Sequence, residues 1–224
     1  MHDDSQRWDA IHQKIHPEKT RHTQYAEDKE KLFPRNSVVV DLGGGTGEDA
    51  LYFLQSGHSV ILFDISEFAI KKAQEKAAQY NLSAKLVVRQ VDYGLEPIPL
   101  KNESVDVAFS RISLDYFPMD QTIMLFHEIF RVLKPQGKAY LAFKSPEDEK
   151  EMEVLRKFAT VYEPGVYIHN NMLLSRFSKD QLAEILTKAG VPKFEVNKYV
   201  EEQHDQSEET HPDLILNDIS FTKE

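Results

Sequence analysis

The sequence predicts an α/β protein built around a doubly wound sheet with right-handed crossovers. Short apolar runs alternate with helical patterns about five times along the chain, the order that βαβ units produce. The first two runs are continuous rather than alternating, as in parallel strands that are buried on both faces. Two further strand candidates follow with no helix between them, so we expect these two to be antiparallel neighbours.

The expected strands are short runs rich in β-branched and aromatic residues. They lie at residues 38–40, 60–63, 86–88, 105–109, 139–143, 194–200 and 214–221. A polar stretch at residues 201–213 joins the last two strands. It holds six acidic residues and no Lys or Arg, so we expect a solvated loop there.

Helix signals separate these runs. Ser66 and Asp120 are candidate N-caps, and Ser178 with Gln181 fits a capping box. Amphipathic helical patterns precede the first strand. We therefore expect an N-terminal helical cap at residues 1–33 and a single α/β domain at 34–224.

Composition and charge exclude several classes of protein. Lys and Arg number 27 against 37 Asp and Glu, a net charge of −10, so we expect no nucleic-acid partner. The absence of cysteine excludes disulfides, thiolate metal sites and cysteine nucleophiles. No apolar run approaches the roughly 18 residues of a membrane span and no signal peptide is visible, so we expect a soluble cytoplasmic protein without a membrane partner. Nothing in the sequence indicates the oligomeric state.

The first expected strand leads directly into a glycine-rich loop. Its sequence is Asp41-Leu42-Gly43-Gly44-Gly45-Thr46-Gly47. Four glycines in five positions exceed what a tight turn needs. In an open α/β sheet, ligands bind beyond the carboxyl ends of the strands, and glycines let a ligand approach the backbone. The loop therefore predicts a ligand site.

The acidic residues around the loop indicate which ligand it takes. Residues 45–50 satisfy G-x-G-x-x-A, and Asp64 ends the second strand, so an NAD(P)-dependent oxidoreductase is an alternative. Glu48 and Asp49, however, would face a pyrophosphate at the helix N-terminus, which favours a cationic ligand without phosphate. S-adenosylmethionine has this chemistry, and Asp92 at the end of the third strand can accept from its adenine amino group.

Taken together, these stretches resemble class I S-adenosylmethionine-dependent methyltransferases over roughly residues 36–145. The matching motifs lie at residues 38–47, 60–66, 91–93, 104–110 and 130–138. A weaker similarity near residues 48–58 is to the small-molecule branch that includes tellurite-resistance and thiopurine-type enzymes. The resemblance implies a seven-stranded mixed sheet of order 3-2-1-4-5-7-6, with strand 7 antiparallel, and a small-molecule methyl acceptor.

The resemblance also implies the contacts of S-adenosylmethionine as cofactor. Asp41 would lie beneath the methionine moiety, Asp64 would hold the ribose, and Asp92 would recognise the adenine. The other residues that it places at the cofactor are Gly43, Gly44, Gly45, Gly47, Ile65, Tyr93, Ser110 and Arg111. The sequence departs from the family at Gly44, where Cys or Ala is usual.

Methyl transfer from a sulfonium is an in-line displacement that requires positioning and exclusion of water. The sequence therefore offers few catalytic signatures. Asp115 and Tyr116 follow the fourth strand, where many relatives have a histidine, and His169 lies in an aromatic and polar stretch at 162–177. These three residues are the catalytic candidates, and we expect the stretch to be a lid or a surface loop. A non-catalytic protein that binds S-adenosylmethionine is a second alternative.

Histidine and arginine side chains offer two further candidate ligand-binding groups. His12 and His16 have the spacing of a helical metal pair, but no third ligand is placed, so we expect no metal. Arg176 could receive an anionic substrate, although a surface position is the expectation. We expect Trp8 and Tyr25 to lie on the apolar side of the cap.

Overall fold

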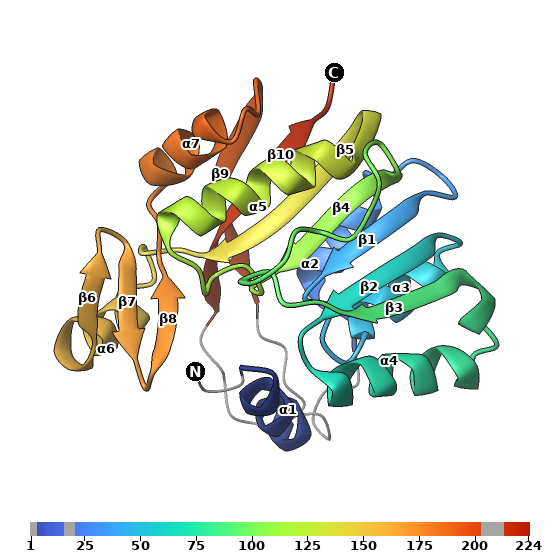
Figure 1. The fold of residues 1–224 in the computed structure, drawn as a ribbon, viewed down its shortest axis with the longest axis horizontal. Coiled ribbons are helices and arrows are strands. Elements are labelled where there is room, and N and C mark those ends of the chain that lie inside the picture. Colours follow the sequence, from blue (N-terminus) through green and yellow to red (C-terminus); the bar gives the residue numbers. More distant parts are fainter. Residues whose placement is uncertain (1–3, 16–20, 203–212) are drawn as a thin grey trace.

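The computed structural model describes residues 4–15, 21–202 and 213–224, and its elements follow one another as the alternating pattern predicts (Figure 1). The helices are α1 (Asp4–Ile15), α2 (Gln24–Glu30), α3 (Glu48–Gln55), α4 (Glu67–Gln79), α5 (Met119–Val132), α6 (Glu149–Phe158) and α7 (Lys179–Lys188), with a 3₁₀ turn at Ser83–Lys85. The strands are β1 (Val38–Leu42), β2 (Ser59–Asp64), β3 (Leu86–Gln90), β4 (Val105–Arg111), β5 (Leu133–Lys144), β6 (Thr160–Glu163), β7 (Val166–His169), β8 (Met172–Ser175), β9 (Phe194–Glu201) and β10 (Leu214–Thr222).

Seven strands form the main sheet in the order β3-β2-β1-β4-β5-β10-β9. The pairs among β1 to β5 are parallel, whereas β10 is antiparallel to both β5 and β9. This confirms the expected order and the single antiparallel strand. Strand order reverses between β1 and β4, so the carboxyl ends of these strands border the crevice where such sheets bind ligands.

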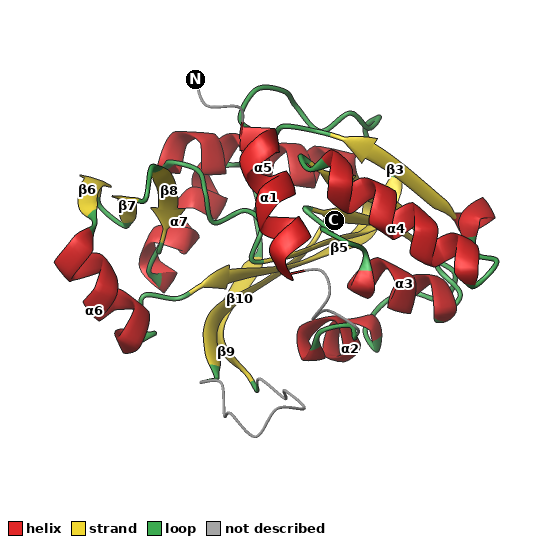
Figure 2. Cartoon of the chain, turned by 90° about the horizontal axis from the view of Figure 1, so that it is seen from below, coloured by secondary structure: helices red, strands yellow, loops and turns green. Residues whose placement is uncertain are grey.

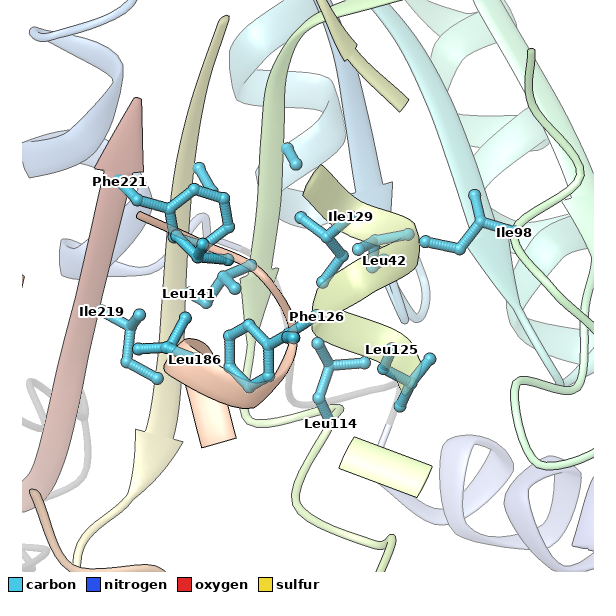
Figure 3. Close-up of a cluster of buried hydrophobic side chains, with 14 of the residues drawn as sticks. Leu42, Ile98, Leu114, Leu125, Phe126, Ile129, Leu141, Leu186, Ile219 and Phe221 are labelled. Atoms are coloured by element: carbon cyan, nitrogen blue, oxygen red, sulfur yellow. The ribbon is translucent and has the colours of Figure 1, made fainter. Parts of the chain in front are cut away.

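Each face of the sheet packs against its own helices, because successive side chains of a strand point to opposite faces. Val40 of β1 lies in a cluster with residues of α5 and α7, such as Phe126 and Leu186, and Figure 3 shows part of this cluster. Val39 lies in a second cluster with residues of α2, α3 and α4, including Phe53. The sheet is therefore buried on both sides, as its continuous apolar runs predict.

The helix starts agree with two of the three predicted caps. Ser66 accepts from the Ala69 backbone N–H, and Ser178 forms the complete capping box with Gln181. The prediction that Asp120 caps α5 is wrong, because Pro118 takes the extended N-cap position. Asp120 instead lies in the first turn of α5, where its negative charge interacts favourably with the positive end of the helix dipole.

A second sheet forms where the sequence suggested a lid or a surface loop. Strands β6, β7 and β8 pair in antiparallel order and cover most of residues 160–175. Each of these strands has only four residues, too few for an alternation of polar and apolar residues to distinguish it from a loop.

In the part of the chain that the structure describes, no helix has the length and apolarity needed to cross a bilayer.

The two N-terminal helices occupy different places. In α2, Tyr25 and Ala26 are fully buried in the second cluster, so this helix belongs to the core. In contrast, α1 lies beyond the carboxyl ends of the strands, between α4 and the β7–β8 turn (Figures 1 and 2). The division into a cap at 1–33 and a domain at 34–224 stays a prediction.

Candidate functional site

The glycine loop turns sharply at the carboxyl end of β1. The backbone N–H groups of Gly43 and Gly44 both donate to the Phe63 carbonyl, at 2.7 and 3.1 Å. Gly45 and Gly47 have φ of +54° and +81°, a region that residues with a side chain rarely adopt. The loop therefore needs glycine for its backbone conformation.

Neighbouring side chains explain two of the glycines further. A Cβ on Gly43 would lie 2.3 Å from the Ser113 Cβ, and one on Gly44 would lie 2.5 Å from Asp41 Oδ2. The departure from the usual Cys or Ala at Gly44 is thus linked to the position of the Asp41 carboxylate.

The carboxylate of Asp64 is bound to the loop at the tip of β2. Its Oδ2 accepts from the Gly45 N–H and its Oδ1 accepts from the Ser66 N–H, each at 2.8 Å. A carboxylate has about four acceptor positions, so ribose hydroxyls can still bind to it. The Ile65 carbonyl accepts from the Gln90 amide at 2.9 Å, which joins the ends of β2 and β3.

Asp41 is buried at the tip of β1, and its Oδ2 has no hydrogen-bond partner within the described ranges. Burial raises the pKa of Asp41 well above its ordinary value, and the nearby charges of Asp49, Asp64 and Glu48 raise it further. Tyr93 lies close by, and its buried hydroxyl likewise lacks a partner among the residues described. Burial and the charges of Asp64 and Asp41 raise the pKa of Tyr93 well above its ordinary value. Both groups offer unfilled polar positions beside the loop.

The N-terminus of α3 is already occupied by acidic side chains of the chain itself. Glu48 accepts from the Thr46 hydroxyl and pairs with Lys76, and its pKa is lowered despite burial by these bonds. Asp49 accepts from the Thr23 N–H at 2.7 Å and the Thr23 hydroxyl at 3.0 Å. A pyrophosphate would face both carboxylates, whereas a cation would be attracted to them.

Asp92 and Tyr93 follow β3 in a tight turn. The Asp92 Oδ1 accepts from the Gly94 N–H at 2.8 Å, and the Leu95 and Glu96 N–H groups donate to the Asp92 carbonyl. Asp41, Asp64 and Asp92 thus lie at the carboxyl ends of three adjacent strands, β1, β2 and β3. The Asp92 carboxylate, however, is hydrogen-bonded within the turn that follows β3.

The tip of β4 contacts the loop through two serines. Ser110 and Ser113 both donate to the Leu42 carbonyl, at 2.9 and 2.5 Å. Between them, Ile112 adopts φ of +52°, a strained conformation for a β-branched residue. The sequence reasoning missed Ser113 and Ile112, because neither residue type marks a ligand site without its neighbours in space.

Arg111 is engaged by another strand. It forms a bidentate pair with Glu201 at the end of β9, and Glu201 also accepts from the Tyr25 N–H at 3.1 Å. Glu201 is only 2% exposed, so the prediction of a solvated loop is wrong for this residue. The desolvated pair with Arg111 accounts for its burial; residues 203–212 lie outside the described residues.

The catalytic candidates Asp115 and Tyr116 border a buried charge cluster. Asp115 is fully buried; its Oδ2 accepts from the Lys144 N–H at 3.1 Å, and its Oδ1 has no partner in the described chain. Burial raises the pKa of Asp115 to about 7, despite the nearby Arg176. Burial also raises the pKa of Tyr116, so this hydroxyl stays neutral at pH 7. His169, the third candidate, lies on β7 opposite Met172.

Arg176 belongs to the same cluster and is not a surface residue. It is 3% exposed and binds Glu151 through Nε and Nη2 at 2.8 and 2.9 Å. Glu151 also accepts from Lys144, and these bonds lower its pKa to about 2 although burial opposes them. The expectation of an exposed Arg176 fails because a glutamate 25 residues earlier neutralises it.

A cavity of about 180 Å³ lies between α1 and the small sheet. Its lining consists of Asp4, Arg7, Trp8, Tyr116, Asn171, Met172 and Leu173. Trp8 meets Tyr116 edge-on with ring centroids 4.9 Å apart, and Arg7 donates to the Asn171 carbonyl at 2.9 Å. An engineered cavity of roughly 150 Å³ admits benzene, so this one has room for a single substituted ring.

The described residues hold no group of three or more His, Asp or Glu side chains placed to bind a metal ion. His12 is buried beside Asp64, at 3.9 Å between Nε2 and Oδ1. The proposed metal partner His16 lies outside the described residues.

Comparison with known proteins finds a similar family for part of the chain. Residues 39–137 match the family described as "Methyltransferase domain". The bifunctional biotin biosynthesis protein BioHC of Cellvibrio japonicus is 28% identical over 146 residues, which are 65% of this chain and 26% of that protein. The chain spans between 26% and 36% of the length of the first three curated relatives.

Solved structures share the fold over nearly the whole chain. An S-adenosylmethionine-dependent methyltransferase from Methanosarcina mazei has a TM-score of 0.71 and 20% identity, over 91% of this chain and 99% of that one. The 1,6-didemethyltoxoflavin-N1-methyltransferase of Burkholderia thailandensis, solved with its substrate and S-adenosylhomocysteine, has a TM-score of 0.63 and 16% identity, over 90% of this chain and 80% of that one.

Proposed function

We propose that this chain is a class I methyltransferase that binds S-adenosylmethionine and methylates a small molecule. The match of residues 39–137 to the family described as "Methyltransferase domain" supports this proposal. The observation that carries the proposal is the surplus of buried acids around the glycine loop. The charges that act on Asp41 are those of Asp49, Asp64 and Glu48, all negative. A ligand with a sulfonium and an ammonium group relieves this repulsion, whereas a pyrophosphate adds to it.

The residues present fit the cofactor. Asp64 would accept the ribose hydroxyls, and the backbone of Gly43 and Gly45 would border the methionine portion. Asp41 Oδ2 and the Tyr93 hydroxyl, both buried and without partners among the described residues, supply polar contacts that the folded chain leaves open. Ser110 and Ser113 hold the β4 tip against the loop and so fix the width of the site.

The bound cofactor supplies an activated methyl group on a sulfonium sulfur. The glycine loop, Asp41 and Asp64 would hold the cofactor with its methyl group available to an acceptor beside Tyr116. The chain contributes positioning and exclusion of water. The Tyr116 hydroxyl, neutral at pH 7, acts there as a hydrogen-bond donor rather than a base.

The 180 Å³ cavity beside Tyr116 is the proposed acceptor site. Its aromatic walls and the side chains of Met172 and Leu173 suit one ring, and Arg7 lies at the same cavity. The toxoflavin precursor bound by the Burkholderia thailandensis neighbour supports a small-molecule acceptor. The net charge of −10 argues further against nucleic acid.

Calorimetry tests the cofactor assignment. We expect S-adenosylhomocysteine to bind at micromolar concentration and NAD to give no heat. Binding of NAD without binding of S-adenosylhomocysteine would reverse the assignment. Turnover of a panel of single-ring acceptors with labelled cofactor then separates an enzyme from a protein that only binds the cofactor.

A further inference from the structure

Helix α1 lies on the edge of the sheet where the cofactor is proposed to bind. Gln90 at the end of β3 donates to the Ser5 hydroxyl at 3.2 Å, and α1 packs along α4. From there it crosses to the β7–β8 turn, where Arg7 binds the Asn171 carbonyl (Figure 2). The helix therefore spans the crevice from the adenine side to the acceptor side.

His12 closes the space above the glycine loop. A Cβ placed on Gly45 would lie only 3.1 Å from the His12 Cε1, closer than ordinary van der Waals contact. The ring thus packs tightly against this face of Gly45. His12 is 7% exposed, so the contact is part of a packed interface.

Asp9 supplies the second contact. Its Oδ1 accepts from the Ser66 hydroxyl at 2.5 Å and from the Phe68 N–H at 3.1 Å. These donors lie at the first turn of α4, directly after the ribose acid Asp64. A carboxylate of α1 therefore binds the polar groups that border the ribose position.

We propose that α1 is an occluding segment: its Asp9 and His12 fill the cofactor's place, and S-adenosylmethionine binds only after α1 moves away from Gly45. The inference rests on the proposed function of the glycine loop. Because Arg7 and Trp8 line the acceptor cavity from the same helix, the displacement takes these two side chains out of the cavity and leaves Tyr116, Asn171, Met172 and Leu173 as its fixed walls. Cofactor binding and the shape of the acceptor site are thereby coupled.

The sign of an affinity change tests the proposal. If α1 competes with the cofactor, the apparent dissociation constant is the intrinsic one divided by the fraction of open molecules. Asp9→Ala and His12→Ala in the full chain should then bind S-adenosylhomocysteine more tightly, by about tenfold, or about 1.4 kcal/mol. Gln13→Ala, on the exposed side of the same helix, is the matched control and should leave the affinity unchanged.

Hydrogen exchange provides a second readout. Amides of residues 4–15 should exchange faster when S-adenosylhomocysteine is bound, because the helix has left its docking site. Weaker binding by Asp9→Ala and His12→Ala, or slower exchange of α1 in the complex, would show that α1 is a roof over the cofactor and overturn the proposal. Unchanged affinity in both variants would overturn it too. Absence of binding in wild type and all variants would contradict the cofactor assignment itself.

Discussion

Two groups of buried and half-buried carboxylates in this molecule differ in whether basic side chains pair with them. Around the glycine loop, Asp41 is surrounded by other acids, and burial and repulsion both raise its pKa. In the cluster beside the small sheet, Glu151 is bound by Arg176 and Lys144, and its pKa is lowered to about 2. In the second group Arg176 and Lys144 pair with Glu151, whereas in the first Lys76 pairs with Glu48 and Asp41 Oδ2 has no partner among the described residues. The difference supports the proposal that the first group, uncompensated at Asp41, binds a ligand, whereas the ion pairs of the second, compensated group join parts of the fold.

Removing the cation from the compensated group should have the largest effect. Arg176→Met leaves the half-buried Glu151 with only Lys144 as its cation, so we expect a loss of up to about 3 kcal/mol in the free energy of unfolding. Urea denaturation measures this loss. Arg156→Met is the matched control, because its pair with Glu149 is 52% and 69% exposed and should contribute at most about 1 kcal/mol. Equal losses in the two variants would remove the distinction between the groups.

Removing an acid from the uncompensated group should instead affect binding. Asp64→Ala removes the proposed ribose acceptor, and we expect at least a hundredfold loss of affinity for S-adenosylhomocysteine, about 2.7 kcal/mol, with the fold retained. Gly45→Val should have a similar effect because φ is +54° there. Calorimetry measures both, and Asp120→Ala, in the first turn of α5, is the control. Undiminished affinity would mean that the cofactor binds elsewhere.

Asp115 sharpens the comparison, because it lies in the compensated cluster and still has a raised pKa. Its pKa rises from 3.8 to about 7, so between these values the folded protein keeps a proton that the unfolded chain loses. The contribution of Asp115 to the free energy of unfolding is therefore highest at low pH, where Asp115 is protonated in both states. It falls as the pH rises from 3.8 to about 7, by up to about 1.4 kcal/mol per pH unit. Asp115→Asn should abolish this slope between pH 4 and 7, as unfolding curves of both proteins over that range would reveal. Parallel stability profiles would contradict it.

The parts of the fold that depend on local pattern could be predicted from the sequence. The continuous apolar runs predicted the parallel strands, and Ser178 with Gln181 predicted the start of α7. Each of these signals is local, because the residues that form it lie within a few positions of one another in the sequence. The pairs Arg176–Glu151 and Arg111–Glu201 could not be predicted, since their partners are 25 and 90 residues apart. Nothing local to Asp9 or His12 shows that α1 lies against Ser66 and Gly45.

Tyr116 lies between the charge cluster and α1, since it follows Asp115 in sequence and packs edge-on against Trp8 of α1. Because its hydroxyl stays neutral at pH 7, Tyr116→Phe should keep the aromatic contact and change stability by less than about 1 kcal/mol. Tyr116→Ala should cost more, because it also loses an aromatic pair worth about 0.5–1.5 kcal/mol beyond its buried area. Turnover of the phenylalanine variant should keep the pH profile of the wild type. If the phenylalanine variant instead lost the change in turnover that the wild type shows at high pH, the Tyr116 hydroxyl would be the group that transfers a proton. This outcome would contradict its role as a neutral hydrogen-bond donor.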